Sequence, residues 1–554
     1  MLALAALCPA VAMAGLEVAV DWNGDGILRT SDHGDPLAPL DQSTPGKPFI
    51  FWLNTDQDDQ DYYETWPLDR ADYETDGIDS LRDLEDFARL LVRLPAPGRQ
   101  PVSKALRFTA EGRGGEFAIN IYHAADRECG NVHLLKRSAG ERQREAAWDR
   151  QVGVIRAGET LDIPLTRMPP SSADNRSHCF LFEGRHEGLA GVRVALVRDG
   201  AVLMQSEPAW ISIRHVKRLY ERVVIPWPEG RKDAWDYEQP PPPLELNWQD
   251  DPQGFAFEPP WHETDDVIVW VYGWLKTAPG MYEMSTVHSG ETIYKRLWHR
   301  GYRGRLVMFH WPTIKQKITL GLMRSEYRGY KSGPVLADHV HSYPPDKRVH
   351  VTAHSLGGIP LAAALAAGME ADTVVFQASA IPAEALDPNP ALILPGLENI
   401  TTPIAPEEGG YHHYLRDSRS RVYSLYNTAD ITFFGWNIAQ KQMKQSAPWF
   451  KSYRWDPGAP DGERATLKTG LFSGSRPVTD PDEVRAFIAH ARTHALGAEP
   501  RVRGVVHEAF DLDRAPYHFG TGHVVAWAWN PQRTTAFYNL VLDLFNIRYN
   551  SEFL

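Results

Sequence analysis

A serine between two small residues joins a strand pattern directly to a helix pattern, and this junction constrains the fold more than any other feature of the chain. The apolar run RVHVTA ends at Ala353, Ser355 follows two positions later, and an Ala-rich run starts at Ile359. A strand that turns into a helix around one residue leaves room only for small residues two positions before and after it. Ala353 and Gly357 meet that need, so we expect a sharp strand–serine–helix elbow. The alternative is an ordinary helix N-cap, a place that serine also favours.

The elbow lies in a stretch where strand and helix patterns alternate. Continuous apolar runs, typical of buried parallel strands, occupy residues 267–274, 304–311, 348–353, 372–378 and 421–427. Helical patterns are expected at residues 290–300, 330–342, 359–368 and 482–496. Such alternation predicts a mostly parallel sheet with helices on both faces. We therefore predict an α/β domain over residues 266–554.

The pentapeptide Ala353-His354-Ser355-Leu356-Gly357, in this setting, resembles the nucleophile elbow of the α/β-hydrolases, with alanine in the first place as in some bacterial lipases. The resemblance covers about residues 265–550. It implies a lipase- or esterase-like serine hydrolase that cleaves a small-molecule, lipid or polymer ester and needs no cofactor for catalysis. In this family the acid and the histidine follow the serine in that order.

Two later residues fit that order. Asp430 follows the strand pattern RVYSLYN, and catalytic groups gather at such strand ends in open α/β sheets; a loop aspartate that caps the next segment is the alternative. His523 lies in the Gly-rich stretch FGTGHVV, on the kind of loop where the family has its histidine. His523 would take the proton of Ser355, and Asp430 would orient the imidazole. Reserve positions are Asp387 and Asp417 for the acid, and His507 and His518 for the base.

Acyl transfer also needs main-chain donors for the oxyanion. Leu356, the residue after the serine, supplies the first amide. The stretch VIVWVYGW resembles the strand that precedes the oxyanion loop of lipases, and this match implies that Trp274 supplies the second amide. Tyr272 stands where the family commonly has histidine. A strand that ends in Gly-Trp can also have purely structural reasons.

The N-terminal part of the chain has a different pattern. Short alternating runs separated by turn residues extend from Leu16 to Ile225 and predict an all-β, sandwich-like domain over residues 15–225. One helix is expected at residues 80–93, where apolar residues recur at helical spacing. Residues 226–265 contain four consecutive prolines and no regular period, which predicts a semi-rigid linker.

An acidic loop near the start of this region matches the ligand spacing of an EF-hand calcium loop. The candidate ligands are Asp21, Asn23, Asp25, Ile27 through its carbonyl, and Asp32 in place of the usual glutamate. We expect a structural Ca²⁺ here, although the same residues also favour a solvated turn. A second acidic run at residues 54–61 either shares this cation or forms a charged solvated loop.

The N-terminal residues and the cysteines indicate the cellular compartment of the protein. Residues 1–14 are predicted to be a signal peptide cleaved before Gly15, which makes the protein secreted, extracellular or periplasmic; a buried N-terminal helix is the alternative. In such a compartment Cys129 and Cys179 form either a disulfide or two buried thiols, and the sequence leaves both open.

Composition narrows the range of partners. The net charge of −13 disfavours nucleic acid, and no later stretch reaches the 18 apolar residues of a membrane span. Aromatic residues at 433–455 form either an apolar acyl pocket or ordinary packing. Fold alone does not fix function, so an amidase or acyltransferase on the same fold and a catalytically inert surface-binding protein stay as alternatives.

Overall fold

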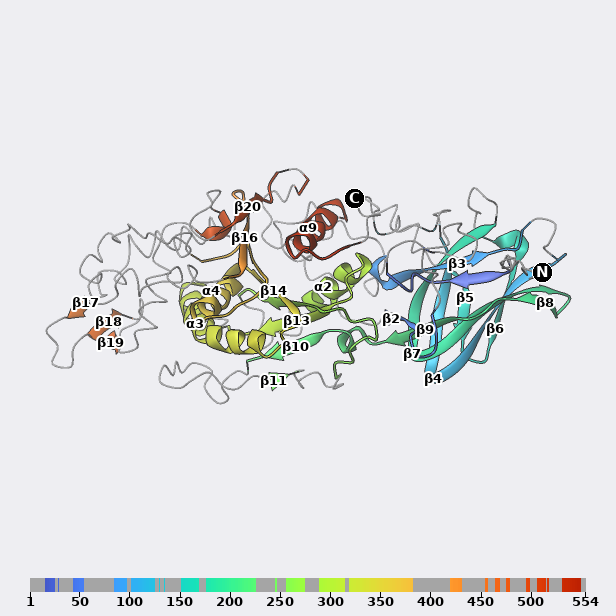
Figure 1. Cartoon of the computed structure of the whole chain (residues 1–554), viewed down its shortest axis with the longest axis horizontal. Coiled ribbons are helices and arrows are strands. Elements are labelled where there is room, and N and C mark those ends of the chain that lie inside the picture. Colours follow the sequence, from blue (N-terminus) through green and yellow to red (C-terminus); the bar gives the residue numbers. More distant parts are fainter. Residues whose placement is uncertain are drawn as a thin grey trace, which may run out of the picture.

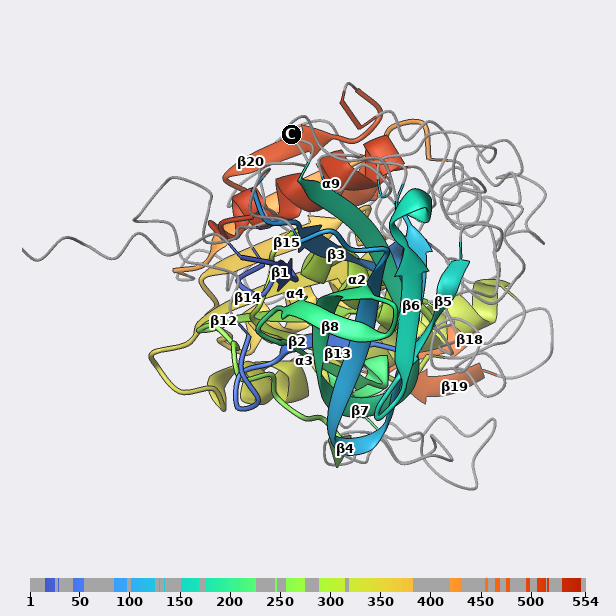
Figure 2. The same ribbon diagram turned by 90° about the vertical axis from the view of Figure 1, so that its right-hand side faces the viewer.

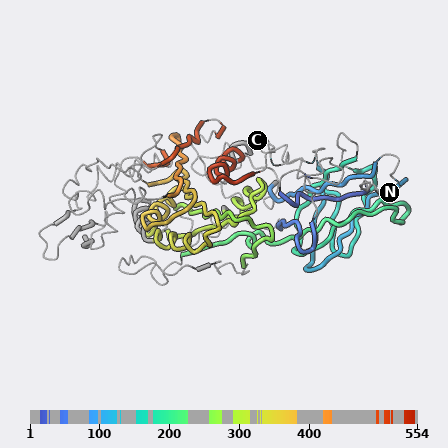
Figure 3. The backbone as a smooth tube through the Cα atoms, viewed as in Figure 1, coloured from blue at the N-terminus to red at the C-terminus, as the bar shows by residue number. Residues whose placement is uncertain are grey.

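The fold is taken from a computed structural model of the chain, shown as a ribbon in Figure 1 and as a tube in Figure 3. The structure describes residues 15–24, 28, 43–53, 84–96, 101–124, 129, 134, 151–168, 176–225, 245–246, 256–274, 288–313, 318–381, 419–430, 454–456, 464–468, 475–478, 495–498, 506–514, 516–517 and 531–549. Their strands form a nine-stranded, an eight-stranded and a three-stranded sheet. The last consists of β17 (Arg454–Asp456), β18 (Arg464–Lys468) and β19 (Ser475–Val478).

The nine-stranded sheet contains the N-terminal strands, at one end of the long axis (Figure 1). These are β1 (Glu17–Ala19), β2 (Phe49–Trp52), β3 (Phe87–Arg93), β4 (Ala105–His123), β5 (Gln151–Arg156), β6 (Thr160–Pro164), β7 (Ser177–Arg198), β8 (Ala201–Gln205) and β9 (Ala209–Arg214). The long strands β4 and β7 pair antiparallel along nearly their whole length, and each carries different partners at its two ends. Figure 2 looks onto this sheet, with the α/β elements behind it. Hydrogen bonds thus join the described N-terminal strands in one mixed sheet, where the sequence predicted an all-β, sandwich-like domain.

The prediction of a helix at residues 80–93 is wrong for the described residues 84–93. A 3-10 turn covers Leu84–Asp86, and Phe87–Arg93 is strand β3, buried at every position between β1 and β7. Because a strand inside a sheet is covered on both faces, its run of apolar residues matches a helical stripe equally well. Pairing with distant strands decides the outcome here.

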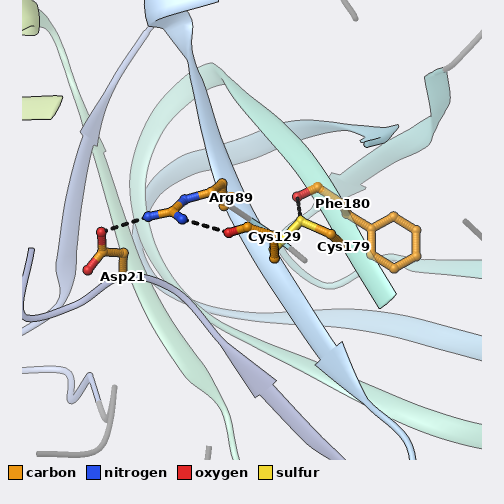
Figure 4. The surroundings of a disulfide bond; sticks show 5 residues. All are labelled: Asp21, Arg89, Cys129, Cys179 and Phe180. Atoms are coloured by element: carbon orange, nitrogen blue, oxygen red, sulfur yellow. Dashed lines mark hydrogen bonds and ion pairs between the residues drawn. A yellow bond between two sulfur atoms is a disulfide. The ribbon is translucent and has the colours of Figure 1, made fainter. Parts of the chain in front are cut away.

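Cys129 and Cys179 form a disulfide in the structure (Figure 4). Arg89 of β3 lies beside it and donates hydrogen bonds to the carbonyl oxygen of Cys129 at 2.6 Å and to Oδ2 of Asp21 at 3.0 Å. The Arg89 side chain is 4% exposed and that of Asp21 16%. One buried guanidinium therefore connects the disulfide to the first residue of the acidic loop.

The eight-stranded sheet has the order β11-β10-β13-β12-β14-β15-β16-β20, and all its pairs are parallel except β10 with β11. Its strands are β10 (Glu221–Val224), β11 (Glu245–Leu246), β12 (Asp266–Val271), β13 (Arg305–His310), β14 (Arg348–His354), β15 (Thr373–Gln377), β16 (Arg421–Tyr426) and β20 (Glu508–Asp511). Four α-helices are described with it: α2 (His288–His299), α3 (Ile318–His341), α4 (Gly358–Ala366) and α9 (Pro531–Leu544). None of these helices is both long and apolar enough to span a bilayer. The predicted mostly parallel α/β architecture is therefore present; most of the helix expected at residues 482–496 lies outside the described residues.

Successive side chains of β12 divide the core between the two faces of this sheet, as strand geometry requires. Val267, Val269 and Val271 join one hydrophobic core with α3 and α4. Ile268 and Trp270 join a second core with α2, α9 and the N-terminal sheet. Figure 1 shows the two pairs of helices on opposite sides of the strands. Helices therefore cover both faces, as predicted.

The second core also joins the N-terminal region, which contains the nine-stranded sheet, to the α/β region, which contains the eight-stranded sheet. Trp298 of α2 packs edge-on against Phe49, Phe51 and Trp52 of β2, with ring centroids 5.1 to 5.5 Å apart. A fully buried ion pair joins Lys295 of α2 to Asp86 at 2.7 Å. The contact between the N-terminal sheet and α2 thus has the packing of a protein interior.

The predicted boundary at residue 225 and the linker at 226–265 differ from the described structure. Strand β10 precedes residue 225 but pairs with β13 in the parallel sheet, and β11 lies inside the predicted linker. Trp261, also in that stretch, stacks on Trp22 with ring centroids 4.9 Å apart. Its indole N–H donates to the carbonyl oxygen of Pro48 at 2.6 Å. The described parts of residues 226–265 are therefore packed against both regions.

Candidate active site

Ser355 occupies a sharp turn between β14 and α4. β14 ends at His354, a 3-10 turn covers Ser355–Gly357, and α4 begins at Gly358. Ser355 has a φ of 55°, a left-handed conformation that costs a non-glycine residue about 1–3 kcal/mol. A Cβ on residue 357 would collide with the carbonyl oxygen of Tyr272, which explains the glycine there. The elbow expected from the small residues is present.

The chain that follows β12 lies directly against Ser355. A Cβ added at Gly273 would lie 3.0 Å from the Cβ of Ser355 and 3.1 Å from the carbonyl oxygen of His354. Trp274, the second predicted donor, follows Gly273 in the segment between β12 and α2. Leu356, the first predicted donor, is buried immediately after Ser355. The structure therefore brings the segments of both predicted donors to the serine.

A stack of two buried rings supports this loop. The ring of Tyr272 lies on that of His310, with centroids 4.5 Å apart and planes 16° apart. Burial, with the nearby positive charge of Arg222, holds the pKa of His310 well below its ordinary value, so the imidazole is neutral at physiological pH. Tyr272 stands where the resembled family commonly has histidine, and its stacking on His310 shows how a tyrosine fits there.

Asp430 lies at the same edge of the sheet, beyond the end of β16. Only β15 separates β14 from β16, so the strands that lead to Ser355 and Asp430 are about 10 Å apart. Main-chain hydrogen bonds join the segments along this edge: Ala380 N donates to the carbonyl oxygen of Ser355 at 2.9 Å, and Asn427 N to that of Gly497 at 2.7 Å. Asp430 is 4% exposed. A buried carboxyl group therefore lies on the serine's side of the sheet.

The histidine predictions differ in their outcome. His523 lies outside the described residues, as do Asp387, Asp417 and His518. His507 is described, and its Nδ1 accepts a hydrogen bond from the main-chain N of Val422 at 3.0 Å. Val422 is near the start of β16, at the edge opposite Ser355, so His507 is excluded as the base. The last described strand, β20, ends at Asp511 beside β16, and His523 follows it in the chain.

The predicted calcium loop is described only in part. Asp21 and Asn23 are described, whereas Asp25, Ile27 and Asp32 are not. One carboxylate oxygen of Asp21 accepts from Arg89, as Figure 4 shows. Within the described residues no group of three or more His, Cys, Asp or Glu side chains could hold a metal ion. Calcium binding stays a prediction, and the acidic run at residues 54–61 also lies outside the described part.

Two polar contacts near the site were not predicted. The indole N–H of Trp311 donates to the carbonyl oxygen of Tyr272 at 2.7 Å. That of Trp274 donates to Oγ of Ser325 on α3 at 3.0 Å. The partners are 39 and 51 residues apart in the chain, so no local pattern could have indicated them.

Comparison with known proteins gives only a partial likeness. No protein-family model and no curated protein sequence matches the chain. An esterase from Pyrococcus furiosus is 16% identical over 30% of this chain and 63% of its own, with a TM-score of 0.17. A thermophilic esterase from the planctomycete Thermogutta terrifontis is 13% identical over 34% and 69%, with a TM-score of 0.21, and a metagenomic carboxyl esterase is 16% identical over 36% and 59%, with a TM-score of 0.16. The matched part is thus less than two thirds of the Pyrococcus chain, and at such TM-scores the functional conclusion depends on the site itself.

Proposed function

We propose that the protein is a serine hydrolase that cleaves carboxylic esters through an acyl-enzyme. The observation that carries this proposal is the backbone of Ser355, which has a φ of 55° at a strand-to-helix turn with the loop of Gly273 against it. Strained backbone of this kind persists where the surrounding structure requires it, often at catalytic sites. An ordinary helix N-cap has β-region dihedrals and gives no reason for this conformation.

In the proposed mechanism Oγ of Ser355 attacks the ester carbonyl carbon while His523 takes its proton. Main-chain N–H groups of Leu356 and Trp274 donate to the oxyanion as it develops. His523 then gives the proton to the departing alkoxide, and Asp430 stabilises the imidazolium. In the second half of the cycle His523 takes a proton from water as the water oxygen attacks the acyl carbon. His523 then returns this proton to Oγ of Ser355 as the Oγ–acyl bond breaks and the acid leaves. The side chains named above account for every proton transfer, so the proposed reaction needs no cofactor.

The test is covalent labelling of the purified protein with a fluorophosphonate, read by intact mass, and hydrolysis of p-nitrophenyl esters. We expect the parent to gain one phosphonyl adduct and Ser355→Ala to gain none, with kcat lower by about 10⁶-fold. Ser342→Ala is the matched control because Ser342 follows α3 at the opposite edge of the sheet, where its hydroxyl donates to the carbonyl oxygen of His339. Asp430→Asn and His523→Ala are expected to lose at least about 10⁴-fold in kcat.

Other results would redirect the proposal. A parent that resists labelling in its folded state would favour the inert surface-binding alternative. Labelling at Ser355 together with faster cleavage of matched amides than of esters, or transfer of the acyl group to an added alcohol, would keep the mechanism and change the reaction class.

We also propose that the protein is exported. The buried disulfide between Cys129 and Cys179 supports this, because such bonds persist in oxidising compartments. Fractionation of the producing cell, with N-terminal sequencing of the exported form, tests it; a first residue of Gly15 is expected. Recovery of the intact chain from the reducing cytosol would contradict export.

A further inference from the structure

The loop that carries Trp274 needs a fixed position if its amide is to serve an oxyanion. A donor contributes to catalysis only when it is held in place before charge develops, and a misplacement of about 1 Å costs up to about 100-fold in rate. We propose that Trp311 and Ser325 are positioning residues that hold this loop against Ser355. The inference rests on the proposed function and adds two residues that do not touch the reacting atoms.

Trp311 holds the start of the loop. Its indole N–H donates to the carbonyl oxygen of Tyr272 at 2.7 Å, and the side chain is 1% exposed. That same carbonyl faces Gly357, where a Cβ would not fit. The Tyr272 peptide is therefore fixed between Trp311 on one side and the nucleophile turn on the other. A shift of this peptide would move Gly273 and Trp274 relative to Ser355.

Ser325 holds Trp274, the last described residue after β12. Its Oγ accepts from the indole N–H of Trp274 at 3.0 Å, and Ser325 is fully buried within α3. Because the side chain and the amide of Trp274 belong to one residue, anchoring the indole restricts the rotation of the peptide that carries the amide. Two side-chain hydrogen bonds therefore hold the described start of this segment, one at Tyr272 and one at Trp274.

Helix α3 connects both anchors to the helix that follows the serine. At Gly329, one turn after Ser325, a Cβ would lie 3.2 Å from Cζ3 of Trp311 and 3.1 Å from Cδ of Pro360 in α4. Trp311 also belongs to the same hydrophobic core as Leu356 and Ile359. One helix thus packs on the loop anchor and on the start of α4. We expect the oxyanion loop and Ser355 to keep a fixed relative position because α3 contacts the supports of both.

A double-mutant cycle tests the Ser325 anchor. Ser325→Ala removes the acceptor, Trp274→Phe removes the donor and keeps an aromatic ring, and the double variant removes both. Each single change is expected to lower kcat about 10-fold with KM and the pH profile unchanged, and the double variant to lose no more than either single one. Trp311→Phe is expected to lower kcat by a similar factor. Ser332→Ala is the matched control, because Ser332 lies on the same helix and its hydroxyl donates a hydrogen bond to the carbonyl oxygen of Arg328. This variant is expected to keep the parental kcat.

The outcomes separate the inference from the proposed function. If the parent is labelled at Ser355 and hydrolyses esters while Ser325→Ala and Trp311→Phe keep the kcat of Ser332→Ala, the positioning role is wrong and the serine mechanism stands. Full additivity of the two losses in the cycle would also overturn it, because the residues would then act independently. A parent with neither labelling nor hydrolysis overturns the proposed function and the inference together. The Tm of each variant is measured by thermal melting, and kcat is assayed well below that Tm. A lower kcat then reflects the folded protein.

Discussion

The two large sheets of this protein use their polar residues in different ways. In the parallel sheet Ser355 and Asp430 lie beyond strand ends at one edge, and the backbone at Ser355 is strained. In the N-terminal sheet and at its junction with α2, buried polar side chains form structural contacts, such as Arg89 with Asp21 and Asp86 with Lys295. Parallel strands bring their carboxyl ends to one edge of a sheet, whereas neighbouring antiparallel strands have their carboxyl ends at opposite edges. The comparison thus separates the proposed catalytic residues, at one edge of the parallel sheet, from buried polar contacts that stabilise the fold.

The largest effect on stability is expected at the buried ion pair between the two regions. Lys295→Met would leave the fully buried carboxylate of Asp86 without its ammonium partner, which costs about 3–5 kcal/mol in free energy of unfolding. Lys295→Met combined with Asp86→Asn should recover much of that loss, because neither charge is then buried and the amide oxygen can still accept from the indole N–H of Trp52, which donates to Asp86 at 2.9 Å. Urea denaturation of the single and double variants measures both values.

An exposed ion pair of similar length is the matched control. Lys104 and Asp199 lie 2.6 Å apart with 66% and 65% of their side chains exposed, and Lys104→Met is expected to cost no more than about 1 kcal/mol. If Lys295→Met cost no more than Lys104→Met, the junction would not have the interior character described above.

A smaller, pH-dependent effect is expected at His262, which also lies at the junction. Burial, with the positive charges of Arg303 and Arg214, lowers its pKa to about 3. The unfolded chain binds a proton below about pH 6.5 and the folded chain does not until about pH 3, so this histidine reduces stability as the pH falls through that window. The contribution is at most about 1.4 kcal/mol per pH unit. His262→Gln should therefore flatten the loss of stability between pH 6.5 and 4.

Chemical denaturation at several pH values measures this slope, and His341→Gln, at an exposed position, is the control. An unchanged slope in His262→Gln would show that other groups cause the acid sensitivity.

The smallest expected effect concerns the strained turn. Ser355→Gly and Ser355→Ala both remove the hydroxyl, but only glycine relieves the φ of 55°, so the glycine variant should be more stable by about 1 kcal/mol while both are inactive. Thermal melting of the two variants measures the difference. Equal stability would mean that the turn stores no strain, and the positive φ of Ser355 would no longer support a special role for this residue.

The sequence predicted the parallel sheet well because its strands are continuous apolar runs. The predicted runs at 267–274, 304–311 and 348–353 became β12, β13 and β14, since burial on both faces leaves a strong local signal. The elbow at Ser355 was also predictable, because the small residues that the turn requires are its close neighbours in the chain.

Features that depend on distant partners were not predictable. Strand β3 was interpreted as a helix because its apolar spacing fits both, and only its pairing with β1 and β7 decides. The membership of β10 in the parallel sheet and the contact of Trp274 with Ser325 likewise join residues far apart in sequence. His523 and three of the five calcium ligands lie outside the described residues and stay predictions.

The shared core behind β12 has a consequence for how this chain could be divided or recombined. Phe49 and Trp52 of the N-terminal sheet and Trp298 of α2 belong to one cluster with Ile268 and Trp270. A cut between the two regions would expose this aromatic cluster to water on both halves, and it would separate Asp86 from Lys295. Because the two parts share a core, we expect them to melt as one cooperative unit, and the half that contains Ser355 to need a matching surface on any other N-terminal sheet to which it is joined.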